Sequence, residues 1–188
     1  MEYRLTTPVT KEDLAPLRAG DTVILSGIVY TARDAAHKRM MERLDKGEKL
    51  PFDLEGSAIY YVGPTPEKPG EIIGSAGPTT SGRMDAYSPR LLDLGQPIMI
   101  GKGKRNGEVK EAIRRNGAVY LAAVGGAGAL MAASVKSVEI ICWDDLPREL
   151  FESFSLSALI IKKRVPTEKT LHLKPGDARK LRLGRFLF

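Results

Sequence analysis

Short apolar runs alternate with amphipathic segments along most of the chain. Residues 21–30 are rich in β-branched side chains and follow a Gly-Asp turn, which predicts a strand with a bulge at Gly27. The apolar residues then change to a helical spacing, and we expect a helix over residues 32–46. Ligand-binding residues are common at such strand-to-helix junctions, because backbone N–H groups there are still unpaired.

The same alternation continues to residue 161 and predicts a single globular domain over residues 1–161. Strands that alternate with short helices around a buried sheet indicate the α/β class. We expect residues 162–188 to form a basic, partly disordered C-terminal tail, because no clear period is visible there. Further strands are expected at residues 58–62, 71–73, 97–100, 118–124, 137–143 and 158–161, and further helices at residues 83–94, 108–115 and 129–135.

The formal net charge of +6 is carried by the tail. Residues 162–188 hold nine Lys or Arg and two acidic residues, which leaves 20 basic and 21 acidic residues in 1–161. A basic groove in the body is therefore not expected, and nucleic-acid binding is disfavoured, although the tail could contact RNA, an anionic surface or only water. No run approaches the roughly 18 to 20 apolar residues that span a bilayer, and the start lacks the apolar core of a signal peptide. We expect a cytoplasmic protein.

Cysteine usage limits the metal chemistry of the chain. Cys142 is the only cysteine, so one copy of the chain forms neither an internal disulfide nor a cysteine-only zinc or iron–sulfur site. We expect no metal ligands in this chain, and any such centre needs a partner.

Three basic residues, Arg33, Arg83 and Lys102, lie just past predicted strands and beside small residues. Arginine can grip a carboxylate with two parallel hydrogen bonds, and flanking glycines let a ligand approach the backbone closely. A dicarboxylate needs two such grips. Each residue taken alone could be an exposed loop charge, but together, with Thr79 and Thr80 between them, they favour a site for a small anion.

Other polar and glycine-rich positions carry weaker signals. His37 lies four residues after the first of these arginines, where it could orient a ligand or a partner's group, or be a partly exposed helix histidine. Asp34 and Asp85 could each fix the arginine nearest to it in sequence. Residues 125–128, Gly-Gly-Ala-Gly, lack the spacing of a dinucleotide-binding loop, and we interpret them as close packing between a strand and a helix.

Four motifs, in this order, resemble the beta subunit or C-terminal domain of class I fumarate hydratases and L-tartrate dehydratases. They are Tyr30-Thr-Ala-Arg-Asp-Ala-Ala-His-Lys-Arg39, Gly77-Pro-Thr-Thr-Ser-Gly-Arg-Met84, Ile100-Gly-Lys-Gly103 and Ala123-Val-Gly-Gly-Ala127. The resemblance implies a swivelling β/β/α fold and a partner alpha subunit, in an assembly such as α2β2. It also implies that the alpha subunit supplies the cysteines of a [4Fe-4S] cluster, which agrees with the single cysteine here.

The resemblance also implies roles for individual residues. Thr79 lies where the family places a proton-transfer hydroxyl, and His37 is a possible orienting residue. A threonine is a poor base, so that role requires stabilisation of its alkoxide by a nearby cation or the partner, or a relay to a carboxylate. The substrate-binding residues implied are Arg33, Gly77, Thr80, Arg83 and Lys102.

These features predict one half of a hydro-lyase, inactive without its alpha subunit, that interconverts fumarate and L-malate. The alternative within the class is an L-tartrate dehydratase beta subunit. An alternative of another class is a non-catalytic dicarboxylate-binding module with an RNA-binding tail. The tail departs from the family's usual C-terminus, whereas all four motifs precede it.

Overall fold

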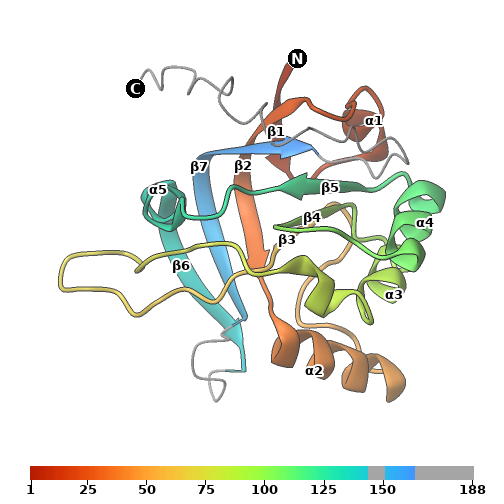
Figure 1. Ribbon diagram of the computed structural model, residues 1–188. Helices are drawn as coiled ribbons and strands as arrows, with labels where there is room; N and C mark the ends of the chain where they lie inside the picture. Colours follow the sequence, from red (N-terminus) through yellow and green to blue (C-terminus); the bar gives the residue numbers. More distant parts are fainter. Residues whose placement is uncertain (144–150, 164–188) are drawn as a thin grey trace, which may run out of the picture.

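A seven-stranded mixed sheet forms the framework of the computed structural model, which describes residues 1–143 and 151–163 (Figure 1). The sheet with its helices confirms the predicted α/β class. The strands are β1 (Glu2–Thr7), β2 (Thr22–Thr31), β3 (Ala58–Tyr60), β4 (Ile98–Gly101), β5 (Val119–Ala122), β6 (Val135–Cys142) and β7 (Phe151–Lys163). The helices are α1 (Lys11–Leu14), α2 (Asp34–Asp45), the 3-10 helix η1 (Ser81–Met84), α3 (Ser88–Asp93), α4 (Gly107–Asn116) and α5 (Gly128–Ala133).

The order of strands in the sheet is β1-β2-β3-β4-β5-β7-β6, and β2 pairs also with β7. Strands β2, β3, β4 and β5 are parallel neighbours, whereas β7 runs antiparallel to both β5 and β2. The β2–β7 pairing therefore closes these five strands into a ring. Because β2 to β5 are parallel, their carboxyl ends lie along the same edge.

Both faces of the central strands are buried, which explains why the sequence shows apolar runs there rather than strict alternation. In β4, Ile98 and Ile100 belong to one hydrophobic cluster, and Met99 between them belongs to the other. The second cluster includes apolar residues of α2, α3 and α4. Figure 1 shows these three helices together on one side of the sheet, with α5 on the opposite side.

The predicted bulge at Gly27 is confirmed. The register between β2 and β7 shifts between Leu25 and Gly27, and Gly27 has φ of +92°. A Cβ atom at this position would lie 2.6 Å from Oγ1 of Thr7 and 2.7 Å from its carbonyl oxygen. Only glycine fits both the left-handed backbone and the close approach of β1.

The predicted strand at residues 71–73 is wrong. These residues lie in the loop 63–75, which extends away from the sheet (Figure 1). The loop is closed at its base by the backbone N–H of Thr65, which donates to the carbonyl of Ser75, and by the N–H of Ser75, which donates to Oγ1 of Thr65. Ile72 is half-exposed and finds no neighbouring strand among the described residues, so β-propensity alone does not form a strand there.

Two other elements differ from the prediction. The helix expected over 83–94 divides into η1 and α3, and β1 with α1 precedes the first predicted strand. The expected strand at 158–161 is confirmed as part of β7, which also contains the first two residues of the predicted tail. Residues 164–188 of that tail lie outside the described residues, so its predicted disorder and RNA contacts remain predictions, as does the swivelling β/β/α arrangement. No helix within 1–143 or 151–163 is long and apolar enough to cross a membrane.

Candidate functional site

The residues singled out from the sequence lie in four segments that follow the carboxyl ends of the parallel strands, with Arg83 on η1 and His37 on α2. Arg33 follows β2, residues 77–80 belong to the segment after β3, Lys102 follows β4, and residues 125–127 follow β5. In parallel sheets with helices between the strands, both open and closed, ligands commonly bind at the carboxyl ends of the strands.

Backbone hydrogen bonds join the threonine segment to the lysine loop. The N–H of Thr79 donates to the carbonyl of Tyr61 over 2.7 Å, and the N–H of Lys102 donates to the carbonyl of Thr79 over 3.3 Å. The N–H of Ser81 donates back to the carbonyl of Lys102 over 2.8 Å, so Thr80 and Lys102 form a short parallel bridge. The structure thus places Thr79, Thr80 and Lys102 side by side.

Gly101 allows this close approach. A Cβ atom at this position would collide with Oγ of Ser81 and would lie 3.0 Å from the ring of Tyr61. The Ser81 hydroxyl is itself fixed, since it shares a 2.9 Å hydrogen bond with the hydroxyl of Tyr120. The glycine of the Ile-Gly-Lys-Gly motif is therefore required by packing.

Arg83, on η1, is paired with Asp34 at the start of α2. Nε of Arg83 donates to Oδ1 of Asp34 over 2.9 Å, and Nη2 lies 2.5 Å from Oδ2. The side chain of Arg83 is still 48% exposed, and within the described part of the chain Nη1 has no hydrogen-bond partner. The carboxylate thus orients the guanidinium and leaves one edge for a ligand. Asp34 is paired with Arg83 and not with its sequence neighbour.

Arg33 and His37 meet through a backbone carbonyl. Arg33 is half-buried at the N-cap of α2, and its carbonyl accepts the backbone N–H of His37 and lies 2.8 Å from Nδ1 of that imidazole. His37 is fully buried, with its ring 5.3 Å from the ring of Tyr61 and 5.8 Å from that of Tyr87. The interpretation of His37 as an exposed helix histidine is therefore wrong.

Burial also decides the charge of His37. The pKa of the imidazole is lowered to about 4, mainly by this burial and also by the nearby Arg105 guanidinium, whereas the bond to the Arg33 carbonyl and the Asp34 carboxylate oppose the change. The ring is neutral at physiological pH. With Nδ1 donating to the carbonyl of Arg33, His37 fixes the backbone at Arg33.

A buried ion pair, Arg105 with Asp85, lies beneath the same loops. Arg105 is only 5% exposed; its Nε donates to Oδ1 of Asp85 over 2.6 Å and its Nη2 to Oγ of Ser88 over 2.6 Å. The guanidinium carbon lies 5.3 Å from the ring centroids of Tyr61 and Tyr120. These charged groups offset much of the cost of their burial by hydrogen bonds and ring contacts.

Arg105 was not among the residues predicted from the sequence, and the partner predicted for Asp85 was wrong. Asp85 pairs with Arg105, twenty positions away, and not with Arg83. Residues 102–105 contain three basic side chains, and their spacing alone does not show that one of them is buried. The available signal was Asp85 itself, an acidic residue among mostly apolar neighbours inside the helix expected over residues 83–94.

The glycine-rich segment after β5 packs against the start of the threonine segment. The N–H of Ala76 donates to the carbonyl of Gly128 over 3.0 Å. A Cβ on Gly128 would collide with Oγ of Ser75 and lie 3.1 Å from the nitrogen of Gly77. Close packing is therefore confirmed only at Gly128, and its neighbour is the segment 75–77 rather than a strand; a Cβ on Gly126 would meet nothing within 4 Å. Lys102 lies beside the same loop, since a Cβ on Gly125 would be 3.9 Å from its Cδ.

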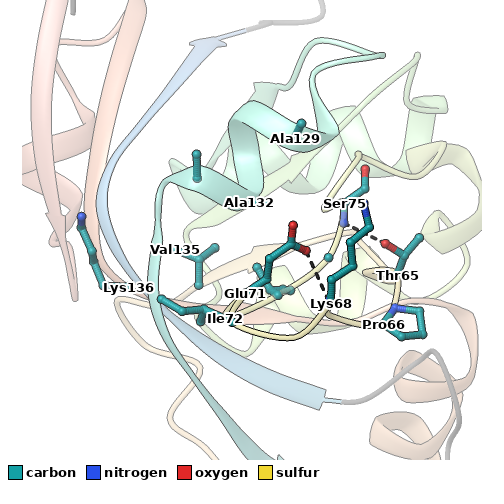
Figure 2. Close-up of a pocket in the computed structure, with 14 residues that line it drawn as sticks. Thr65, Pro66, Lys68, Glu71, Ile72, Ser75, Ala129, Ala132, Val135 and Lys136 are labelled. Carbon is teal, nitrogen blue, oxygen red and sulfur yellow. Dashed lines mark hydrogen bonds between the residues drawn. The ribbon is translucent and has the colours of Figure 1, made fainter.

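The described cavities lie elsewhere. A cavity of about 620 Å³ lies between the loop 63–75, α5 and the start of β6, and Lys68, Glu71 and Lys136 are among its lining residues (Figure 2). A second cavity, of about 570 Å³, lies near α1 and the N-terminal end of β4. None of the site residues predicted from the sequence lines either cavity.

The chemical capacity of the site rests on two cations and two hydroxyls. Arg83 and Lys102 are exposed, Thr79 is half-buried, and Thr80 is exposed. Such a set can hold and polarise a small carboxylate anion. Within the described residues, no group of three or more His, Cys, Asp or Glu side chains could hold a metal ion.

Comparison with known proteins places these motifs in context. The family model described as Fumarase C-terminus matches residues 1–162. A Methanocaldococcus jannaschii protein provisionally named L(+)-tartrate dehydratase subunit beta is 41% identical over 158 residues, which are 81% of this chain and 80% of that protein. The L(+)-tartrate dehydratase subunit beta of Escherichia coli is 34% identical over 149 residues, 78% of this chain and 73% of that protein.

A third relative is much longer than this chain. The aerobic class I fumarate hydratase of Escherichia coli is 41% identical over 127 residues, which are 66% of this chain but 23% of that protein. The chain therefore corresponds to most of the tartrate dehydratase subunits and to about a quarter of the fumarate hydratase.

Proposed function

The chain belongs to the fumarase C-terminus family, and from this premise we propose that it is the beta subunit of a hydro-lyase acting on a four-carbon dicarboxylate. The proposed reaction is the reversible hydration of fumarate to L-malate. Dehydration of L-tartrate is the alternative, because relatives carrying either name match at 34% to 41% identity. The other half of the active site is proposed to come from an alpha subunit, in a hetero-oligomer such as α2β2.

One observation supports this proposal most strongly. Two exposed cations, Arg83 and Lys102, and the hydroxyl-bearing Thr79 lie in adjoining loops at one edge of the parallel strands, joined by the hydrogen bonds around Thr79. Arg33 lies next to Asp34, the residue that pairs with Arg83. The three basic residues therefore lie in the segments that follow β2, β3 and β4, which are neighbouring strands.

In the proposed mechanism, the cations hold the substrate and stabilise developing charge. Removing a proton from the carbon beside a carboxylate places negative charge on that carboxylate, which Arg83 and Lys102 would stabilise. Oγ of Thr79 would give a proton to carbon during hydration and take it back during dehydration. Deprotonating a threonine hydroxyl is costly in water, because the resulting alkoxide is a strong base. Thr79 therefore needs these cations to lower the free energy of its alkoxide. Thr80 and Gly77 would shape the loop and offer hydrogen bonds.

The residues of this chain do not fit the [4Fe-4S] cluster that the resemblance implies. Cys142 is the only thiol, and burial raises its pKa to about 11, which disfavours the thiolate that iron requires. No metal-binding group is found elsewhere in the described residues. We propose that the cluster's protein ligands belong to the alpha subunit.

The site assignment is tested by Arg83→Ala in the complex of this chain with its alpha subunit. The variant should lower kcat/KM for fumarate or L-tartrate by about 100-fold or more, as expected when a charge-stabilising donor is lost. The matched control is Arg90→Ala, because the side chain of Arg90 is 43% exposed and pairs with Asp45 as that of Arg83 pairs with Asp34. Near-normal turnover in the Arg83 variant, or an equal loss in both, would reject the assignment.

A further inference from the structure

The buried pair Arg105–Asp85 connects the two chain segments that carry the exposed cations. Asp85 lies two residues after Arg83 at the end of η1, and Arg105 lies three residues after Lys102. The second oxygen of Asp85 accepts the backbone N–H of Asn106 over 2.7 Å. The pair is therefore a direct link between the η1 loop and the loop that leads from β4 into α4.

Arg105 makes more contacts than charge neutralisation requires. In addition to its contacts with Asp85 and Ser88, its Nη1 lies 3.4 Å from the hydroxyl of Tyr61. Its guanidinium carbon lies 5.3 Å from the ring centroids of both Tyr61 and Tyr120. Arg105 thereby contacts three parts of the chain: the segment after β3, the segment after η1, and strand β5. A planar fork with five donors can hold several such groups in fixed directions, which the single point charge of a lysine cannot.

Stability alone is a poor explanation for this arrangement. Removing two charged groups from water is costly, and well-packed apolar side chains of similar volume often give equal or greater stability. What such a pair supplies is a defined geometry. Here that geometry is transmitted over two or three residues to Arg83 and Lys102, whose spacing decides how a dicarboxylate is held.

We propose that Arg105 and Asp85 are positioning residues that set the distance and direction between Arg83 and Lys102. This inference rests on the proposed function and adds to it two residues that touch no substrate. A misplacement of a cation by an ångström weakens transition-state binding more than it weakens the fold. The proposal therefore predicts a loss of catalysis that thermal stability does not explain.

The test uses Arg105→Lys in the complex with the alpha subunit. The variant keeps the positive charge and loses the fork that reaches Asp85, Ser88 and Tyr61 together. We expect kcat/KM for the dicarboxylate to fall at least about tenfold, at a temperature far below the melting temperature. The matched control is Arg115→Lys, because Arg115 makes a two-bond pair with Asp93 on the surface; this variant should keep wild-type kcat/KM.

A second variant, Asp85→Asn, keeps an acceptor for the Asn106 N–H and should give the same kinetic loss even if Arg105→Lys does not fold. Wild-type kcat/KM in either folded variant would overturn the proposal, because a purely structural pair lowers only the melting temperature.

The inference can be separated from the proposed function by NMR on the full chain alone. Arg105→Lys should move the signals of the Arg83 Nε–H and the Lys102 amide, and Arg115→Lys should move neither. If the wild-type complex turns over neither dicarboxylate, the proposed function fails, yet these signals still decide the positioning role. Unchanged signals in Arg105→Lys would overturn that role.

Discussion

The buried imidazole of His37 should make the free energy of unfolding depend on pH between neutral and mildly acidic solution. The side chain is fully buried, and its pKa is lowered from 6.5 to about 4, with burial as the largest cause. Arg105 pushes the pKa in the same direction, while the hydrogen bond to the Arg33 carbonyl and the Asp34 carboxylate push it upward. The net effect is a neutral ring in the folded chain.

The sign of the effect follows from proton binding. The unfolded chain protonates His37 as the pH falls below 6.5, whereas the folded chain keeps it neutral down to about pH 4. The contribution of the neutral His37 to the free energy of unfolding is thus present above pH 6.5. It is lost progressively as the pH falls from 6.5 to about 4. For these two pKa values, the loss between pH 7 and pH 5 is about 2 kcal/mol.

The assay is urea unfolding of the full chain at pH 7 and pH 5, compared between the wild type and His37→Gln. Both proteins keep His172 and all carboxyl groups, so the difference between their pH dependences belongs to His37. The wild type should lose about 2 kcal/mol more than the variant on acidification. Equal losses, or an imidazole that titrates near 6.5 by NMR in the folded chain, would refute the reasoning.

Two glycine substitutions test the packing around the site and the sheet by urea unfolding. Gly27→Ala should lower the free energy of unfolding by about 2–4 kcal/mol, because φ is +92° and the new Cβ would meet Thr7. Gly20→Ala, with φ of +90° and open space, is the control and should cost about 1–2 kcal/mol. Gly101→Ala should cost about 1–3 kcal/mol through its collision with Ser81, and unchanged stability would contradict the packing described at the site.

The sequence predicted those parts of the fold in which local pattern and burial agree. The strands near residues 58–62, 97–100 and 118–124 were recognised because both of their faces are buried, which makes them continuous apolar runs. The strand predicted at residues 71–73 fails because strand formation needs a neighbouring strand, and Glu-Ile-Ile in this loop has none among the described residues. Strand β1 was missed because most of its residues are exposed or only partly buried, as in an edge strand. Its sequence therefore has no continuous apolar run.

The sequence predicted which residues belong to the candidate site, but not which side chains pair with one another there. Gly77, Thr79, Thr80 and Lys102 follow strands that are neighbours in a parallel sheet, and this determines that their loops meet. Pairings between distant residues were not predictable, because the local sequence pattern does not indicate them. Arg83, for example, pairs with Asp34, which lies 49 positions away in the sequence. The burial of His37 was missed for the same reason, since the rings that cover it come from other segments.

The central claim, that this chain is one half of a hydro-lyase, is tested most directly by mixing separately purified subunits without oxygen. The full chain and its alpha subunit, reconstituted with iron and sulfide, should each be inactive toward fumarate and L-tartrate, and activity should appear on mixing and saturate at a fixed ratio of the subunits. Turnover by the alpha subunit that this chain does not increase, or an assembled complex that turns over neither dicarboxylate, would contradict the claim.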